Sequence, residues 1–354
     1  MSIIVGDFIG DLAGRARAGN QVITYDAFQP QTSIYGDVSG LVRNDARGGD
    51  DNVTVSASAA GTFGDASGIS DKGRGGNDTI TLAPELSNIA YGDAYIMTGS
   101  SVGGRDTLII TDQSWGEEEP VLGTNTLYGD AYAMTGKAVG GDDSFAHRGF
   151  GTVYLYGDAF TLTDSTKGGK DTVDLLAWGG SFVFGDADTL SKNSVGGADS
   201  LTVWGGDVRG DARLMQDSAK GGNDKLYVGA EGSTTAWGDA DQMTGSAKGG
   251  ADLISFRESS RLTGTAFGDG GTMADYTTGG NDTIEGGAGP QRDPGLWRRR
   301  GDDRARQGWQ RYHQRRRDQR CRVRRCQDDD GQHCGWGGQA YRVRRPRDHD
   351  RRRR

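Results

Sequence analysis

The sequence predicts an all-β protein, a parallel β-solenoid of about nine coils with one 28-residue repeat per coil. Two markers return along residues 34–286: a Gly-Asp pair and, eleven residues later in eight of nine copies, a Gly-Gly pair. Five of the eight steps between successive Gly-Asp pairs are 28 residues long. A unit with so few apolar residues cannot enclose a core alone, whereas stacked units cover one another's apolar faces. Nine coils at strand spacing would extend about 43 Å.

Each unit is expected to contain three short strands. They are the run that ends before the Gly-Asp pair, the run that follows it, and the run after the second Asp, such as "DTLII" at 106–110. Runs of β-branched and large apolar residues bounded by Gly-Asp or Gly-Gly are typical of strands between turns. We expect the marker glycines to form tight corners, because glycine tolerates positive φ. The cross-section could have two faces or three.

Two apolar columns accompany the markers. An aromatic residue precedes the marker Gly in eight copies, from Tyr35 to Phe267, with Arg209 as the exception. This column predicts either a stack that closes each coil or a sugar-binding strip. The residue five positions after the marker Gly is always apolar and is expected in the core: Leu41, Ile69, Met97, Met134, Leu162, Leu190, Met215, Met243 and Met273.

Composition divides the chain into three segments. Residues 1–33 resemble a decayed first coil and predict an N-terminal cap, residues 34–286 form the solenoid, and residues 287–354 form an Arg-rich tail. The net charge is -21 over residues 1–286 and +13 over the tail. The start shows no signal peptide, and no apolar run approaches the ~18 residues of a membrane span. The long step from Gly92 to Gly129 predicts that Trp115–Gly123 protrudes from the stack.

The tail begins directly after "GGNDTIEGGAG" at 279–289 and contains many Gln-Arg pairs. Gly-Asn-Asp codons read in a shifted frame yield Gln-Arg, so we interpret the tail as a frameshifted, disordered continuation of acidic repeats. Shifting the coding frame at Gly289 should restore Gly-Asp-rich repeats. A basic arm for nucleic acid is the alternative, and we expect no nucleic-acid partner. Cys321, Cys326, His333 and Cys334 fit no usual zinc-ligand spacing.

Two aspartate columns carry the candidate chemistry. The first consists of Asp37, Asp65, Asp93, Asp130, Asp158, Asp186, Asp211, Asp239 and Asp269. The second consists of Asp51, Asp78, Asp106, Asp143, Asp171, Asp199, Asp224, Asp252 and Asp282. Carboxylates about 4.8 Å apart repel by about 0.9 kcal/mol in water and about 3.5 kcal/mol at an effective dielectric of 20. Both columns therefore predict bound cations, and Ca²⁺ suits such oxygen ligands. The alternative is that each Asp only caps its own turn.

"GGNDTIEGGAG" resembles the Gly-Gly-x-Gly-x-Asp-x-apolar-x nonapeptide of the repeats-in-toxin (RTX), hemolysin-type calcium-binding proteins. The resemblance covers roughly residues 34–289. It implies calcium held at the corners of a parallel β-roll, a secreted, extracellular protein, and type I export through an uncleaved C-terminal signal. The second Asp column matches the motif's Asp. In the first column "GDA" replaces Gly-Gly-x-Gly, and the 28-residue period differs from two nonapeptides per coil. A frameshifted tail would lack the export signal.

Three function classes follow. The first is an extracellular calcium-binding structural or scaffold protein that folds on Ca²⁺. The second is an adhesin or polysaccharide-binding module on the same solenoid, with extracellular or cell-surface polysaccharide as partner. The third is an enzyme appendage. Residues 1–286 contain one histidine, His147, no cysteine and no sequence like a zinc helix or a catalytic triad. We therefore do not expect an enzyme.

Overall fold

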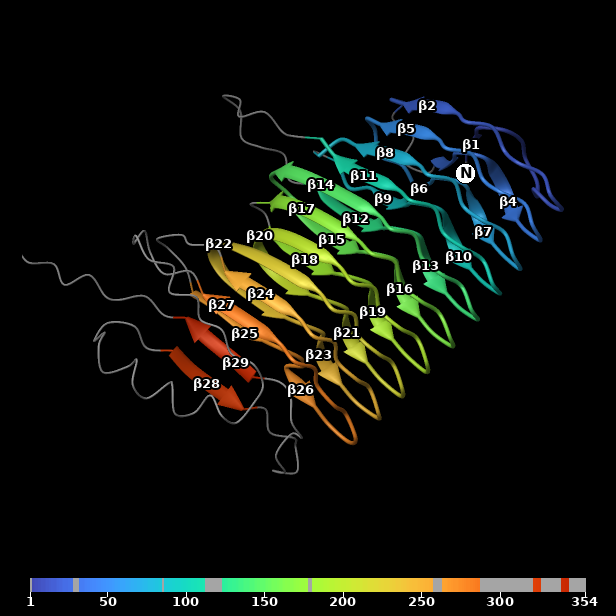
Figure 1. The fold of residues 1–354 in the computed structure, drawn as a ribbon. Helices are drawn as coiled ribbons and strands as arrows, with labels where there is room; N and C mark the ends of the chain where they lie inside the picture. The colour runs from blue at the N-terminus through green and yellow to red at the C-terminus, as the bar shows by residue number, and fades with distance from the viewer. Residues whose placement is uncertain are drawn as a thin grey trace, which may run out of the picture.

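The computed structural model describes residues 2–27, 32–84, 86–111, 123–177, 180–256, 263–286, 321–325 and 339–343. Within these ranges the chain forms strands, turns and no helix. The strands of residues 2–286 stack in parallel, coil upon coil, and Figure 1 shows the stack running from β1 and β2 to β26 and β27. The predicted fold class, a parallel β-solenoid of about nine coils spaced by about 28 residues, is confirmed.

Three strands make each of the nine repeated coils, as the repeat predicts, and the first coil has two. Sheet 1 contains the strands that lead to the Gly-Asp pair: β1 (Ser2–Val5), β3 (Thr32–Tyr35), β6 (Gly61–Phe63), β9 (Ile89–Tyr91), β12 (Thr124–Tyr128), β15 (Thr152–Tyr156), β18 (Ser181–Phe184), the ends of β20 (Ser200–Arg209) and β22 (Lys225–Trp237), and β25 (Thr263–Phe267). Sheet 2 follows the pair: β4 (Val38–Val42), β7 (Ala66–Ile69), β10 (Ala94–Met97), β13 (Ala131–Met134), β16 (Ala159–Leu162), β19 (Ala187–Leu190), β21 (Ala212–Met215), β23 (Ala240–Met243) and β26 (Thr272–Met273). Sheet 3 follows the second Asp: β2 (Val22–Tyr25), β5 (Asn52–Val55), β8 (Thr79–Leu82), β11 (Thr107–Ile110), β14 (Ser144–Gly149), β17 (Thr172–Ala177), the starts of β20 and β22, β24 (Leu253–Phe256) and β27 (Thr283–Gly286).

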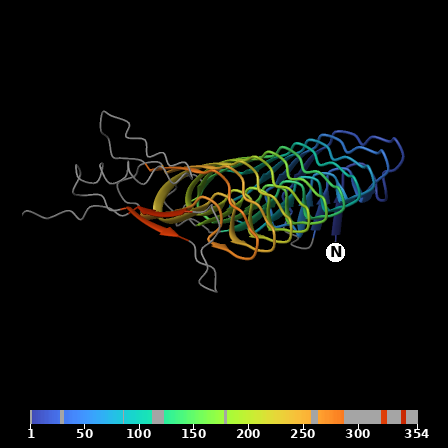
Figure 2. The same cartoon turned by 60° about the horizontal axis from the view of Figure 1, so that its bottom comes forward.

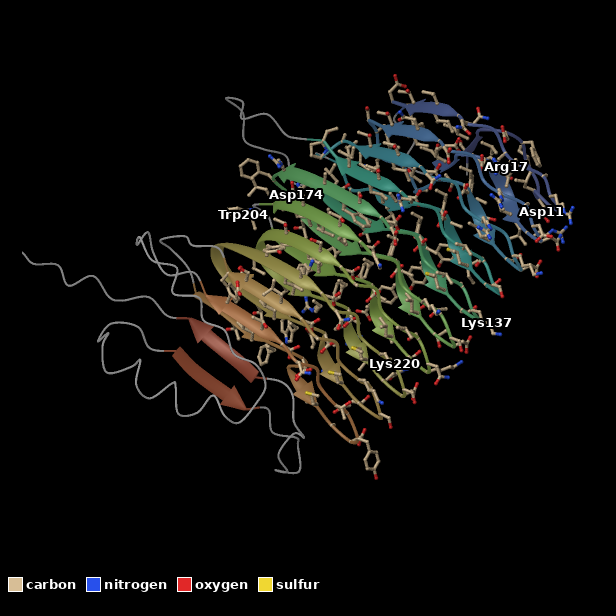
Figure 3. The ribbon with its side chains drawn as sticks, viewed as in Figure 1. Asp11, Arg17, Lys137, Asp174, Trp204 and Lys220 are labelled. Carbon is tan, nitrogen blue, oxygen red and sulfur yellow. The ribbon has the colours of Figure 1, made fainter. Side chains whose placement is uncertain are left out.

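The register keeps equivalent residues in contact. Ala94 pairs with Ala131 and Met97 with Met134 across β10 and β13. Between sheets 2 and 3 a single residue per coil forms a parallel bridge to the next coil, and these residues are Arg17, Arg47, Arg74, Val102, Val139, Lys167, Val195, Lys220, Lys248 and Thr278. Figure 3 shows Lys137 and Lys220 along this edge, and Asp174 and Trp204 at the opposite edge.

The prediction of the core column is wrong for one residue, Leu41. Val42, and not Leu41, pairs with Ile69, because β4 contains an extra residue and its register shifts between Val38 and Leu41. Val42 is fully buried and Leu41 is only half-buried. The other eight residues of the column are buried as predicted. The same extra residue accounts for the twelve-residue spacing between markers in the first copy.

Each coil runs out along one layer and returns along the other, so the cross-section has two layers (Figure 2). Two separate apolar cores fill the space between them. Core 1 contains buried residues of sheets 1 and 3, for example Leu127 and Phe145. Core 2 joins sheet 2 to the start of the return layer, for example Met134 and Ala138. Both Asp columns lie in the chain between a strand of core 1 and a segment of core 2.

The first 25 residues stack on the next coil in register. β1 pairs with β3, β2 pairs with β5, and Phe8, Leu12 and Arg17 bridge to the following coil. The described tail consists of β28 (Cys321–Arg325) and β29 (Gln339–Val343), which pair antiparallel, and β29 also pairs with β25. The other tail residues lie outside the described residues, and so do residues 115–122 of the predicted protruding segment Trp115–Gly123.

Candidate functional site: a buried carboxylate seam

The first Asp column turns inward and crosses between the two layers. Asp130 is fully buried, and one of its oxygens accepts a hydrogen bond from Gly141 N at 2.8 Å, eleven residues later on the return layer. Asp158 accepts from Gly169 N at 2.7 Å in the same way. The equivalent hydrogen bond is present in every repeated coil and joins the two layers in the middle of the coil.

The second Asp column links one coil to the next. Asp143 Oδ1 accepts a hydrogen bond at 2.7 Å from the backbone N–H of Asp106, its equivalent in the preceding coil. Asp171 Oδ1 accepts from Asp143 N at 2.8 Å. The pattern continues to Asp282, which accepts from Asp252 N at 3.1 Å. Each of these aspartates therefore bonds a backbone donor of a neighbouring coil and does not only cap its own turn.

These bonds leave a second set of carboxylate oxygens without a partner. Fifteen such oxygens are buried and unpaired among the described residues: those of Asp37, Asp51, Asp78, Asp106, Asp130, Asp143, Asp158, Asp171, Asp186, Asp199, Asp211, Asp224, Asp239, Asp252 and Asp269. Carboxyl groups of the first column also contact one another, as Asp65 does with Asp37 and Asp93. None of the ion pairs formed by the described residues involves either column. We call the two facing columns, from Asp37 to Asp282, the carboxylate seam.

The marker glycines leave room for the seam. A Cβ on Gly129 would lie 1.7 Å from the carbonyl oxygen of Gly157 and 2.2 Å from Asp143 Oδ2. A Cβ on Gly141 would lie 1.5 Å from the carbonyl oxygen of Gly104. The expectation that these glycines take positive φ is wrong, because every positive-φ glycine lies outside both marker columns. Close approach of neighbouring coils, and not a left-handed turn, requires glycine here.

Burial opposes ionisation of the seam. It raises the pKa of Asp130 from 3.8 to about 6 and that of Asp224 to about 7. Burial, reinforced by the charge of Asp37, raises the pKa of Asp51 to about 8. Burial and the neighbouring carboxylates hold the pKa values of most other seam aspartates, such as Asp171, well above the usual range. At neutral pH the seam therefore needs protons or cations to offset its charge.

The donor chemistry fits a hard cation, with one restriction. Unpaired, buried carboxylate oxygens are the ligands that Ca²⁺ prefers, together with backbone carbonyls and water. In the part of the chain that the structure describes, however, no three His, Cys, Asp or Glu side chains are arranged to hold a metal ion. Backbone carbonyls and water would therefore have to supply the ligands that the carboxylates do not. The eighteen predicted ligands are thus brought together in two columns, but inside the coil and not at its outer corners.

Gln21 lies directly before the second column of the seam, and the search for Gly-Asp and Gly-Gly markers did not reveal it. Val22 pairs with Asn52, so Gln21 occupies the position of Asp51 in the first coil. Its backbone N–H bonds Asp51 Oδ1 at 2.6 Å, and its side-chain amide bonds Asp7. Aligning "GNQVI" with "GDDNVTV" would have placed an uncharged residue at this end of the second column.

The aromatic column is a stack on the outside of sheet 1. Rings from Tyr35 to Phe184 lie 4.8 to 5.0 Å apart between centroids and within 10° of parallel. Arg209 continues the stack, because its guanidinium carbon lies 4.9 Å from the Phe184 ring centroid and 4.4 Å from that of Trp237. It also forms a two-pronged ion pair with Asp241, with Nε–Oδ1 at 2.7 Å. Because neighbouring rings cover each other's faces, this column lacks the open faces on which sugars stack.

No protein-family model, curated protein or solved structure matches this chain. Across the described ranges, no helix is long and apolar enough to cross a membrane.

Proposed function

We propose that this chain is an extracellular calcium-binding repeat protein of the RTX kind, whose solenoid folds on Ca²⁺ and serves a structural or scaffold role. The observation that carries the proposal is the set of fifteen buried carboxylate oxygens without a partner. Buried carboxylates of this number oppose folding unless protons or cations neutralise them. At neutral pH a cation neutralises the carboxylates more effectively than protons do, because the proton concentration is low.

Calcium is the cation that the seam favours. Its ligands are oxygen atoms in flexible arrangements, whereas Mg²⁺ demands a tight octahedron and retains its water. The side chains of the two seam columns are all carboxylates, and backbone groups surround them. The columns therefore offer oxygen ligands and no nitrogen or sulfur ligand. The chain's own residues would hold the ion between coils, and the ion would supply the positive charge that lets both layers close.

The polysaccharide-binding alternative has less support. Its candidate surface is the aromatic column, whose rings stack face to face and are buried from Phe63 to Phe184. The second aromatic ladder, Tyr95, Tyr132 and Phe160, is stacked as well, with centroids 5.2 and 5.3 Å apart. Binding to a glycan array, undiminished by loss of Tyr95, would nevertheless favour a glycan site elsewhere on this solenoid.

Far-UV circular dichroism tests the calcium proposal. The chelated chain should be largely unfolded at neutral pH, and millimolar Ca²⁺ should produce a cooperative gain of β-structure that Mg²⁺ reproduces poorly. Asp171→Asn with Asp199→Asn should raise the calcium concentration at the midpoint, whereas Asp318→Asn in the tail should not. A chelated chain that keeps its full β-spectrum at neutral pH would show that the proposal is wrong.

A further inference from the structure

We infer that the seam holds one divalent cation per repeated coil, nine in all, in an internal file that ions leave only when coils separate. The inference rests on the proposed calcium binding and specifies its number, its place and its exchange. It depends on three features of the seam: its charge per coil, the glycine walls and apolar cores that flank it, and the way it ends.

Charge determines the number. Every repeated coil contributes one aspartate of each column, so each coil adds two negative charges to the interior. In five successive coils, those of Asp130 to Asp239, both aspartates leave an unpaired oxygen. One divalent cation neutralises such a pair, whereas a second would leave a buried excess of positive charge.

The first coil supplies no further site. Gln21 stands where the second column would place an aspartate, and its side chain bonds Asp7. Asp7 also accepts a hydrogen bond from Gly19 N at 2.8 Å and is exposed to solvent. A lone, solvated carboxylate with both oxygens bonded needs no cation. The file therefore begins with the coil of Asp37 and Asp51.

The sides of the seam are closed. Core 1 lies on one side and core 2 on the other, and their members are almost all fully buried. Along the layers the marker glycines close the remaining space: Gly169 approaches the carbonyl oxygen of Gly141 so nearly that a Cβ would lie 1.3 Å from it. From Asp65 to Asp252 the seam aspartates are at most 2% exposed. Asp282 at the far end is only half-buried.

An ion in the middle of the file has no lateral path to solvent. Its release requires a coil interface to open, which is a sub-global unfolding event and much slower than dissociation from a surface site. Ion release and loss of β-structure should therefore follow the same time course. A surface site would instead release its ion while the fold persists.

The experiment uses the full chain, loaded with Ca²⁺ and freed of excess ion by gel filtration. Elemental analysis should find nine calcium ions per chain. On mixing with a fluorescent chelator, calcium release and the far-UV circular dichroism signal should decay with one rate constant. Eighteen ions per chain would overturn the stoichiometry, and rapid release from a chain that keeps its β-spectrum would overturn the closed file. No bound calcium at all would overturn the proposed function itself, so the two failures are distinguishable.

Matched variants locate the ions. Asp158→Asn with Asp171→Asn removes both charges of one central coil and should lower the count from nine to eight. The control pair is Asp142→Asn with Asp174→Asn, which are exposed and form surface ion pairs with Arg105 and Arg148. The control should retain nine ions. If the central variant does not fold, the end variant Asp269→Asn with Asp282→Asn should fold with eight, and nine ions there would contradict the inference.

Discussion

Acidification in the absence of divalent ions should fold this chain rather than unfold it. The seam carboxyls have pKa values raised by burial, so the folded state binds protons more tightly than the unfolded state does. A carboxyl whose pKa is raised by folding stabilises the folded state at pH values below its pKa in the unfolded chain, which is near 4. This stabilisation is lost as the pH rises through the pKa of the folded state. For Asp37 and Asp130 the folded pKa is about 6, which sets the lower end of the transition.

The magnitude follows from the same two residues. A rise from 3.8 to about 6 corresponds to about 3 kcal/mol for each carboxyl that must ionise in the folded state. Two such residues cost about 6 kcal/mol, and total stabilities of domains are about 5 to 15 kcal/mol. Asp51, whose pKa is raised to about 8, extends the loss to higher pH. Ionising the whole seam without cations should therefore exceed what the two apolar cores can offset.

The assay is far-UV circular dichroism of the chelated chain between pH 3 and 9. We expect a β-spectrum near pH 4 that is lost between about pH 5 and 8. With saturating Ca²⁺ the dependence should reverse, because protons then compete with the metal and the fold should weaken as the pH falls. A chelated chain that is more stable at pH 8 than at pH 4 would refute the reasoning. The seam carboxylates could then not be both buried and without a neutralising cation.

Three further outcomes are expected from thermal or denaturant unfolding of the calcium-loaded chain. Gly104→Ala should destabilise the fold by more than about 4 kcal/mol or abolish folding, because its Cβ would lie 1.5 Å from a backbone carbonyl oxygen. The control Gly286→Ala should change the stability by less than about 1 kcal/mol, because its Cβ would meet nothing within 4 Å. Arg209→Ala should cost about 3 kcal/mol, because it breaks a buried ion pair and two cation–π contacts; an unchanged midpoint would show that the stack does not need it. Deleting residues 115–122 of the predicted protruding segment should change the midpoint little, since loop length affects closure entropy only weakly, and loss of the fold would place this stretch in the core.

Much of this architecture could be predicted from the sequence, because the repeat is a direct record of stacking. A 28-residue period places equivalent residues one strand spacing apart, and it therefore predicts the three strands per coil, the buried column of Ile, Leu and Met in sheet 2, and two unbroken columns of aspartate. The same period predicts that each column is a continuous feature along the axis. The sequence also predicts Ca²⁺, since like charges repeated at close spacing need counter-ions.

The tertiary structure alone decided which way the columns face. Residues at a bend belong to no alternating strand pattern, so periodicity cannot tell whether Asp130 points to solvent or crosses to Gly141 in the opposite layer. It also cannot separate a glycine required for positive φ from one required for close approach, because both read as Gly. Arg209 breaks the aromatic pattern in the sequence, yet it meets its partners only when the coils stack, because Phe184 lies in the preceding coil and Trp237 and Asp241 lie in the following coil.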